Sequence, residues 1–522
     1  MLHSSSLSKQ AVILIVQTIL IVLALTSCST LHIYRGQTTV TQTKRSFAGQ
    51  YFTKAGSSLN ERDLNVTPEM FGAVADGATD DAPALRLASN YAAEKKAPLV
   101  LKSGATYFIA SKEGSSVINV PYLFLKGNNA HFKIADLGDF DALIHARSTG
   151  GYSNISNLTI EFSPNNTTTQ TEKEFAEVGA RRSCLVLGGT PDGLGEAYVQ
   201  NVHIINAMGV WEFDFNQCKK GYIKDCVIDY STQKMSWDRT SIYLGCNNFE
   251  CSNNLLHGKG FGKTGIETHG YNITVSANTI EGYKAPILLT SVYDTKPSVD
   301  DVLSLICEGN HCVCEQPLQI WAINNKVQSI TIRDNTITTS RTDANESGHG
   351  SCLWLYDVVA DCEINEILVN NNMFTQAKGS APAVYLAPSR GTGLVIHDIE
   401  FRNNTFNCGN YLIACKSWAT NNLIENITFK ENEINCLNSS RIIGVVNSSS
   451  MFKNISFTKN IFKNNPSSLN TTSSPNGLSI CWDSNRFENT IDQATDICSF
   501  KGRQNIDYTK LHFLQNAKRD EL

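Results

Sequence analysis

Between about Asn154 and Asn485 the chain alternates short apolar strands with polar turns in a recurring segment. Each copy has apolar residues at every second position, then a polar turn with an asparagine, then a second short apolar stretch. Clear copies lie at residues 271–280, 328–337, 366–374, 398–406, 425–434 and 453–462. The spacing is about 27 to 38 residues with one longer interval, which is typical of stacked repeats. Period-2 strands stacked in parallel would bury one side-chain set in a common interior.

The recurring asparagines have a structural explanation. Asparagine tolerates left-handed turn conformations, and stacked side-chain amides can pair from one repeat to the next. We therefore interpret the asparagines as scaffold and look for function elsewhere in each repeat.

A different pattern precedes the repeats. Residues 71–81 read FGAVADGATDD, and a helical stretch follows over 82–96. Asp80 or Asp81 can cap its first turn, and three residues form one apolar face: Leu85, Ala88 and Ala92. Short strands then surround a turn near Gly104.

The segment from Phe71 to Leu85, together with Gly104, Thr106 and Tyr107, resembles the opening of the pectate-lyase-like superfamily, in its rhamnogalacturonase and epimerase-like group. The resemblance implies an all-β chain: a right-handed, single-stranded parallel β-helix of the pectin-lyase-like type, with the helix as an N-terminal cap. We expect this domain to span residues 66–500. Glycosidases, lyases, epimerases and phage tailspikes share the fold, so the resemblance does not select a chemistry.

The N-terminus predicts export. Lys9 precedes an apolar run over 11–25, which is short for a membrane span, and the residues up to Cys28 resemble a bacterial lipobox. We expect residues 1–28 to be a signal peptide with Cys28 lipidated, 29–65 a tether, and 501–522 a C-terminal tail. The chain would then be a membrane-anchored envelope lipoprotein or a secreted protein. The alternative is a eukaryotic secretory protein, because Lys518–Leu522 resembles an ER-retention signal and sequons such as that at Asn272 are frequent.

Net charge and cysteine content bear on two further possibilities, a nucleic-acid partner and a metal site. The net charge of -5 offers no basic field, so nucleic acid is not an expected partner. Among the 16 cysteines, Cys226 and Cys251 occupy strand positions suited to a small core residue. Cys307, Cys312 and Cys314 lie near His311, but their spacing favours free thiols or a loop disulfide over a zinc site.

A second, less uniform strand recurs between the asparagine strands, and alternation predicts which of its side chains point outward. The predicted outward column contains Asp214, Tyr243, Glu267, His269, Thr290, Trp321, Trp354, Tyr356 and Tyr385. An exposed row of Trp and Tyr suits the rings of an extended sugar chain. The alternative is that the loops 292–316 and 339–350 cover the aromatic rings, which then form a secondary core.

Glu267 and His269 are the sharpest candidate pair, because strand residues two apart share a face. Asp214 lies two repeats away in the same column, a separation of about 9.6 Å at the usual strand spacing. That is close to the range of about 6.5 to 9.5 Å for the two carboxyl groups of an inverting glycosidase. Asp238 and Arg239, on the intervening repeat, would supply a second carboxylate or a cation for a uronate, or form a turn salt bridge.

Three functions follow. The first is hydrolysis of a polysaccharide by Glu267 with Asp214 or Asp238, with Arg239, Tyr243 and the aromatic row binding substrate and no cofactor or metal required. The second is a polysaccharide lyase or epimerase, with His269, Lys263 or Tyr243 as the base and Arg239 or a calcium ion neutralising a uronate. The third is a glycan-binding surface protein without catalysis. Gly348–Gly350 resembles a polygalacturonase element, but the paired aspartates of that family are absent. The sequence does not specify the glycan or an oligomeric state.

Overall fold

The computed structural model describes residues 64–138, 140–164, 183–207, 211–230, 240–290, 304–322, 326–341, 350–357, 362–376, 381–387, 394–409, 411–415, 422–436, 443–445, 451–463, 479–487 and 497–501. All of them belong to one compact unit, Asn60–Leu522. The predicted signal peptide with Cys28, nearly all of the tether and nearly all of the C-terminal tail lie outside the described residues. No helix in the described part of the chain is long and apolar enough to cross a membrane.

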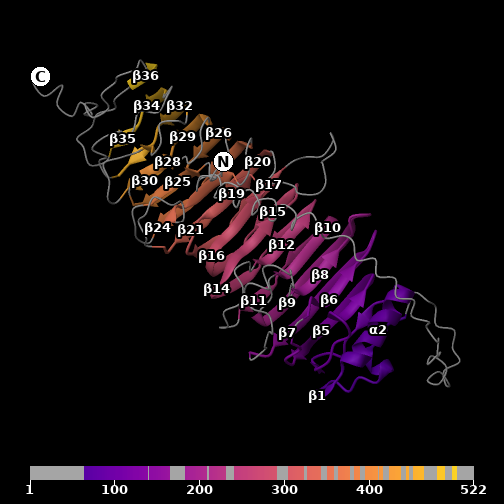
Figure 1. The fold of residues 1–522 in the computed structure, drawn as a ribbon. Coiled ribbons are helices and arrows are strands. Elements are labelled where there is room, and N and C mark those ends of the chain that lie inside the picture. The colour runs from indigo at the N-terminus through magenta and orange to yellow at the C-terminus, as the bar shows by residue number, and fades with distance from the viewer. Residues whose placement is uncertain are drawn as a thin grey trace, which may run out of the picture. The chain divides into compact units, whose positions relative to one another are not determined.

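The strands form a stack of coils, and the chain climbs the stack in sequence order (Figure 1). Each coil contributes a strand to each of three faces, so a strand pairs with the equivalent strand one coil earlier and one coil later. Short period-2 segments separated by polar turns produce this arrangement, because each strand buries alternate side chains and each turn redirects the chain. The predicted parallel β-solenoid is confirmed, and its right-handed sense stays a prediction.

The three faces are named here by their strands. Face 1 consists of β4 (Ser116–Val120), β6 (Ala142–Arg147), β8 (Ser183–Gly188), the first part of β10 (Trp211–Lys224), β12 (Thr240–Cys246), the last parts of β14 (Leu255–Thr268) and β16 (Thr279–Thr290), β19 (Leu318–Ala322), β22 (Leu353–Asp357), β25 (Pro382–Ala387), β28 (Tyr411–Cys415) and β31 (Ile443–Val445).

Face 2 consists of β2 (Leu99–Val100), the first parts of β5 (Tyr122–Ile134), β7 (Tyr152–Phe162) and β9 (Gly195–Ala207), the last part of β10, β13 (Phe249–Ser252), β15 (Ile273–Ser276), β17 (Leu305–Glu308), β20 (Lys326–Arg333), β23 (Glu363–Asn370), β26 (Val395–Arg402), β29 (Leu423–Lys430), β32 (Met451–Thr458), β34 (Ser479–Asp483) and β36 (Ile497–Lys501).

Face 3 consists of β1 (Asp76–Asp80), β3 (Thr106–Ile109), the remaining parts of β5, β7, β9, β14 and β16, together with β11 (Val227–Tyr230), β18 (His311–Cys314), β21 (Thr336–Thr339), β24 (Met373–Gln376), β27 (Thr405–Cys408), β30 (Glu433–Cys436), β33 (Ile461–Phe462) and β35 (Arg486–Phe487). Among all these strands the pairings are parallel, except that β36 runs antiparallel to β34.

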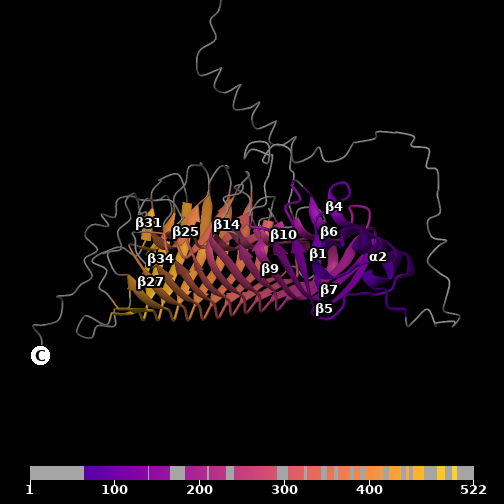
Figure 2. The same cartoon turned by 90° about the horizontal axis from the view of Figure 1, so that it is seen from below.

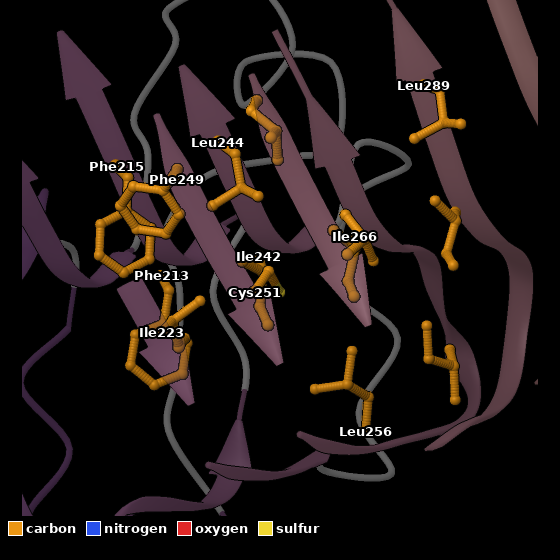
Figure 3. Packing of buried hydrophobic residues seen from close by; sticks show 14 of the residues in the cluster. Phe213, Phe215, Ile223, Ile242, Leu244, Phe249, Cys251, Leu256, Ile266 and Leu289 are labelled. Atoms are coloured by element: carbon orange, nitrogen blue, oxygen red, sulfur yellow. The ribbon is translucent and has the colours of Figure 1, made fainter. Parts of the chain in front are cut away.

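The interior is packed by the inward side chains of all three faces. Figure 3 shows residues from several neighbouring coils, including Phe213, Ile242 and Ile266 from face 1 and Cys251 from face 2. Equivalent positions meet from coil to coil: Phe213 is registered with Ile242, and Ile242 with Ile266. Stacking like on like removes nearly all of this apolar surface from water, which is the main driving force for the fold.

A ladder of buried asparagines runs along the turn between faces 2 and 3. Each ladder amide donates to the side-chain oxygen of the next, at 2.9 or 3.0 Å, through Asn254, Asn278, Asn310, Asn335, Asn372, Asn404, Asn432, Asn460 and Asn485. The same oxygens also accept backbone N–H groups, as Asn404 does from the N–H of Asn372. The predicted pairing of stacked amides is confirmed.

The left-handed positions belong to neighbouring residues rather than to the ladder itself. Within the repeats, the residue before a ladder asparagine has positive φ, as at Asn371 (56°) and Asn403 (51°). A second left-handed position lies just before a face 2 strand or within it, for example at Asn272 before β15 and at Asn426 within β29. These two asparagines lie within sequons, so the backbone geometry alone accounts for their amino-acid type.

The predicted helix is present as α2 (Ala82–Lys95), and its apolar face is buried as expected, with Leu85 and Ala88 fully covered. It lies beside the first coils, at the N-terminal end of the stack (Figure 2), and is preceded by the short 3-10 helix η3 (Pro68–Phe71). The Asp80 carboxylate accepts the Ala82 N–H at 3.2 Å, whereas the carboxylate of Asp81 binds the N–H of Val74 at 2.7 Å. That the helix seals the interior stays a prediction.

Most of the described cysteines pack in the hydrophobic interior of the stack. In the described part of the chain eleven cysteine side chains are buried, whereas that of Cys481 is exposed. Cys307, Cys312 and Cys314 lie on the regular strands β17 and β18 and point into the core, whereas His311 is exposed. The expectation that these cysteines lie in a loop spanning 292–316 is therefore wrong, and their thiols do not converge on His311.

Candidate active site

The strands of face 1 align the candidate residues in two outward rows. The first, called the central row, follows the strand register through Asn119, His145, Val186, Asp214, Tyr243, Glu267, Leu288, Gln319, Trp354 and Tyr385. The second row lies two residues further along each strand and contains Arg147, Gly188, Asn216, Gly245, His269, Thr290, Trp321 and Tyr356.

The predicted spacing of the two acids is confirmed. Asp214 is registered with Tyr243, and Tyr243 with Glu267, so the acids stand two coils apart on one face. The sequence pattern aligns Trp321 with Trp354, but this alignment is displaced by two residues, because Gln319 is registered with Trp354 and Trp321 with Tyr356. Gln319 therefore takes the place in the central row, and Trp321 joins the second row.

Glu267 is held by two hydrogen bonds. Its Oε1 lies 2.7 Å from Nε2 of His269, and its Oε2 accepts the hydroxyl of Thr240 at 2.9 Å. Burial favours the neutral acid, but the His269 hydrogen bond and charge, with Thr240 and Lys263, outweigh it and lower the pKa of Glu267. Glu267 is therefore a carboxylate at neutral pH, which suits a base or a charge stabiliser better than a proton donor.

A stack of three rings fixes the imidazole. Tyr243 lies between Trp211, at 4.5 Å between ring centroids, and His269, at 4.7 Å, with both pairs close to parallel. The stack and the carboxylate together restrain both the position and the tilt of the His269 ring. A preformed geometry of this kind is what a catalytic base requires.

The sequence pattern did not identify Trp211 or Thr240 as site residues. Each lies two positions before a core residue, Phe213 or Ile242, so strict alternation predicts that both point inward. Instead the Trp211 ring stacks on Tyr243, and Thr240 binds Glu267. The following residue, Ser241, bonds the buried Tyr283 hydroxyl, so the strand turns over at this point.

Asp214 is only 4% exposed and accepts a hydrogen bond from the side-chain amide of Asn216. Asn216 is flanked in the second row by two glycines, Gly188 and Gly245. The row therefore has no side chain on either side of Asn216, and the Asn216 carbonyl oxygen approaches Gly188 so closely that a Cβ atom there would lie 2.1 Å from it. Glycine in a strand often marks such a place of close approach.

Asp238 and Arg239 lie outside the described residues. Among the residues that the structure describes, the candidate second carboxylate is therefore Asp214. That part of the chain also contains no group of three or more His, Cys, Asp or Glu side chains arranged to hold a metal ion.

The aromatic residues form a cluster on the C-terminal side of the two acids. The Trp354 and Tyr356 rings stack at 4.4 Å, and Trp321 packs against Tyr356 at 4.6 Å. The indole N–H of Trp321 donates to Gln319 at 2.8 Å. Tyr356 and Tyr385 are buried and the two tryptophans half-buried, so the expectation of a fully exposed aromatic row is wrong. Neighbouring rings, one coil apart, cover much of each other's surface.

Two further residues on face 1 were also missed from the sequence. His145 and Arg147 on β6 belong to the central and second rows, two coils before Asp214 and Asn216. Both are half-buried. The alternation within Ala142–Arg147 was a usable signal, but only the strand register places these residues in line with the acids.

Comparisons with known proteins bear on the fold. No family model matches the sequence, and no curated protein matches it. Among solved structures, a mutant tailspike protein of E. coli bacteriophage HK620 in complex with pentasaccharide superposes with a TM-score of 0.53 at 12% identity, over 81% of this chain and 78% of the tailspike. A second tailspike mutant gives 0.51 at 13% identity, over 84% and 81% of the two chains.

The A-module of the Azotobacter vinelandii mannuronan C-5 epimerase AlgE6 gives a TM-score of 0.46 at 13% identity, over 74% of this chain and 98% of the module. At these identities the likeness concerns the fold. Together with the coil register, the tailspike superpositions confirm the parallel β-solenoid fold that the resemblance implied.

Proposed function

We propose that this chain is an exported carbohydrate-active enzyme that hydrolyses a polysaccharide on face 1, with Glu267 and Asp214 as the catalytic pair. The observation that carries the proposal is their placement two coils apart in the central row. Two coil steps correspond to about 9.6 Å, at the upper end of the range for inverting glycosidases. The HK620 tailspikes hold a pentasaccharide on the same fold, which supports a glycan as the ligand.

The two acids take different roles in the proposed reaction. Glu267, whose pKa is lowered chiefly by its His269 hydrogen bond against the effect of burial, is the base that takes a proton from water. Asp214 gives its proton to the leaving glycosidic oxygen as the bond from that oxygen to the anomeric carbon breaks. The water oxygen forms the new bond to the anomeric carbon, and the product has inverted configuration. Tyr243 lies between the two acids, where a sugar ring would contact its hydroxyl.

A lyase or epimerase reaction is the second candidate, and one observation favours it. His269 is oriented by Glu267 at 2.7 Å and by the Tyr243 ring, as a base that removes a proton beside a uronate carboxyl group would be. A bound calcium ion would be an added requirement of that reaction. In the third candidate, face 1 binds a glycan through Trp321 and Trp354 without cleaving it.

A polysaccharide panel tests these assignments. The full chain is incubated with each polymer, and new reducing ends and ultraviolet absorbance are followed. Hydrolysis yields reducing ends without the unsaturated uronide that a lyase produces. Glu267→Gln and Asp214→Asn should each abolish cleavage, whereas Glu281→Gln, an exposed glutamate on face 3, should not. Unchanged cleavage by Glu267→Gln contradicts the site, and binding without turnover favours the third candidate.

Export and lipid anchoring are proposed from the sequence alone. Lys9, the apolar run over 11–25 and Cys28 support a lipoprotein signal. Expression with a labelled fatty acid tests this, because Cys28→Ala should lose both the label and membrane association.

A further inference from the structure

Face 1 continues beyond the acids toward the N-terminal end of the stack, where its chemistry changes. His145 lies in the central row with Asp214, and Arg147 lies in the second row with Asn216, each separated from its counterpart by the single coil of β8. Two coil steps are about 9.6 Å, about the length of two sugar units in an extended chain. A glycan lying along the rows would therefore reach both places.

Arg147 is a cation without an acidic partner. Its Nε donates to the carbonyl oxygen of Gly189 at 2.8 Å, which holds the guanidinium in place. Across the described ranges, no carboxylate lies within ion-pair distance of it, although other arginines have one, such as Arg333 with Glu308 and Arg402 with Glu431. A half-buried guanidinium with unused N–H groups is a ready partner for a carboxylate or a sulfate.

His145 provides a hydrogen-bonding group beside this cation. Its Nδ1 lies 3.2 Å from the side-chain oxygen of Asn119, so an Nδ1-protonated ring donates there and leaves Nε2 as an acceptor. Burial, and to a smaller extent the charge of Arg147, lower the pKa of His145, so the ring is neutral near pH 7. His145 therefore suits a sugar hydroxyl, and Arg147 an anionic group.

The coil between Arg147 and Asn216 has no side chain in the second row, because that position is Gly188. A Cβ atom at Gly188 would lie 2.1 Å from the carbonyl oxygen of Asn216 and 2.6 Å from Sγ of Cys218, and its φ is +120°. Packing thus excludes any side chain there. The Gly188 coil therefore places no side chain in the second row between the guanidinium and Asn216.

We propose that Arg147 forms a subsite for an anionic substituent of the glycan, with His145 accepting a neighbouring hydroxyl group, and that the polysaccharide bound on face 1 is therefore acidic. This inference rests on the proposed function and deepens it, because it names the substrate class of the same face. A uronate carboxylate and a sulfate ester share the required chemistry, and the test separates them.

The test measures binding of the full chain to four polymers by affinity electrophoresis at low salt: polygalacturonate, its carboxyl-reduced neutral form, dextran sulfate and dextran. The wild-type chain should bind one acidic polymer more tightly than its neutral counterpart. Arg147→Gln should weaken that binding by about tenfold or more, the usual effect of losing a charged hydrogen-bond partner. Binding to the neutral counterpart should not change.

Arg402→Gln is the matched control, because it removes the same charge from an exposed residue on face 2. It should leave binding within about twofold of wild type. Arg147→Lys keeps the charge but lacks the planar fork of N–H groups, so its affinity for the acidic polymer should lie between those of the wild type and Arg147→Gln. If the glutamine variant does not fold, the lysine variant provides the test. Polygalacturonate as the preferred polymer identifies a carboxylate, and dextran sulfate identifies a sulfate.

The proposal is overturned if the wild-type chain binds neither acidic polymer in preference to its neutral form. It is also overturned if Arg147→Gln binds the acidic polymer as tightly as the wild type does, or if Arg147→Lys does so where the glutamine variant does not fold. Its failure is distinct from failure of the proposed function. Cleavage of a neutral glycan that depends on Glu267 but not on Arg147 retains the function and removes the inference. Binding of an acidic glycan that depends on Arg147 but is not followed by cleavage retains the inference and removes the proposed hydrolysis.

Discussion

Nε2 of His269 lies 2.7 Å from Oε1 of Glu267, which stands near the end of β14, and His269 directly follows that strand, two residues further along the chain. The side chain of Glu267 is only 16% exposed and that of His269 6%. Hydrogen bonds to the His269 imidazole and the Thr240 hydroxyl hold the largely buried Glu267 carboxylate in its ionised form. Its replacement should therefore affect activity more than the stability of the fold.

Glu267→Gln tests this expectation directly. The glutamine keeps the size of the side chain and an oxygen for the Thr240 hydroxyl, so the melting temperature should stay close to that of the wild type. Turnover of a substrate found by the polysaccharide panel should fall by about 100-fold or more, the usual contribution of a general base. Equal turnover in the two proteins would remove Glu267 from the reaction.

A surface histidine should give the stability of the coil stack a pH dependence. His397 on β26 lies 2.9 Å from Glu363 on the preceding coil and 2.7 Å from Asp398. Burial opposes the charge on His397, but these two carboxylates outweigh it and raise its pKa above 6.5. Burial likewise opposes the charge on Glu363, but His397 and Lys326 outweigh it and lower its pKa below 4.5.

The signs of the two shifts define a window. Because the pKa of His397 is raised in the folded state, its protonated ring stabilises the fold. This stabilisation is fully present below the unfolded pKa of 6.5 and is lost as pH rises through the folded pKa. A lowered carboxyl pKa stabilises the fold above 4.5, and this contribution is lost as pH falls through the folded pKa. His397→Gln should therefore lower the melting temperature more at about pH 5.5 than at about pH 9. A shift independent of pH would show that the contact does not contribute.

The asparagine ladder should be costly to interrupt. Asn372 donates to Asn404 at 2.9 Å and accepts both the backbone N–H and the amide of Asn335. Asn372→Ala leaves buried donors on Asn335 without an acceptor, and we expect a loss of about 1 to 3 kcal/mol or more. The control is Asn407→Ala, a half-buried asparagine on β27 whose amide bonds to the Thr375 hydroxyl at 3.3 Å, where the change should stay within about 0.5 kcal/mol. Urea denaturation followed by circular dichroism compares the two, and equal effects would show that burial of the ladder does not matter.

The sequence predicted the features that depend on strict repetition. Asn278, Asn335 and Asn404 recur at the same position of each copy, so their stacking followed from the pattern alone. The two-coil spacing of Asp214 and Glu267 followed from counting strands in the same way. The row that contains Gln319 was displaced, because the long segment between β16 and β19 interrupts the period from which the register was counted.

Exposure was harder to predict than register. Alternation gives the direction of a side chain, but whether it remains exposed depends on what packs beside it. Tyr356 and Tyr385 point outward as predicted, yet both are buried: Tyr356 packs against Trp321 on the preceding coil and Trp354 on its own strand, and Tyr385 against Trp354 on the preceding coil. Trp211 escaped prediction for a different reason: its ring stacks on the outward Tyr243 although it lies two positions before the inward Phe213, and alternation contains no signal for that arrangement.

Two glycines of the second row should respond in opposite ways to the same methyl group. At Gly188 a Cβ would lie 2.1 Å from a backbone oxygen at a φ of +120°, so Gly188→Ala should destabilise the fold. At Gly245 the nearest atoms to a Cβ are the Phe215 carbonyl oxygen at 3.1 Å and Tyr243 at 3.3 Å, so a small adjustment accommodates it. Alanine also lowers the entropy of the unfolded chain, and Gly245→Ala should keep stability within about 1 kcal/mol of wild type.

Activity should then separate from stability at Gly245. Its added methyl group enters the interval between Asn216 and His269, where the proposed glycan approaches the catalytic pair. We expect Gly245→Ala to raise KM or lower kcat by about tenfold, a loss of about 1.4 kcal/mol in transition-state binding, while its melting temperature is retained. Full activity in a folded Gly245→Ala variant would mean that substrate does not contact this part of face 1, and would move the binding site away from the two acids.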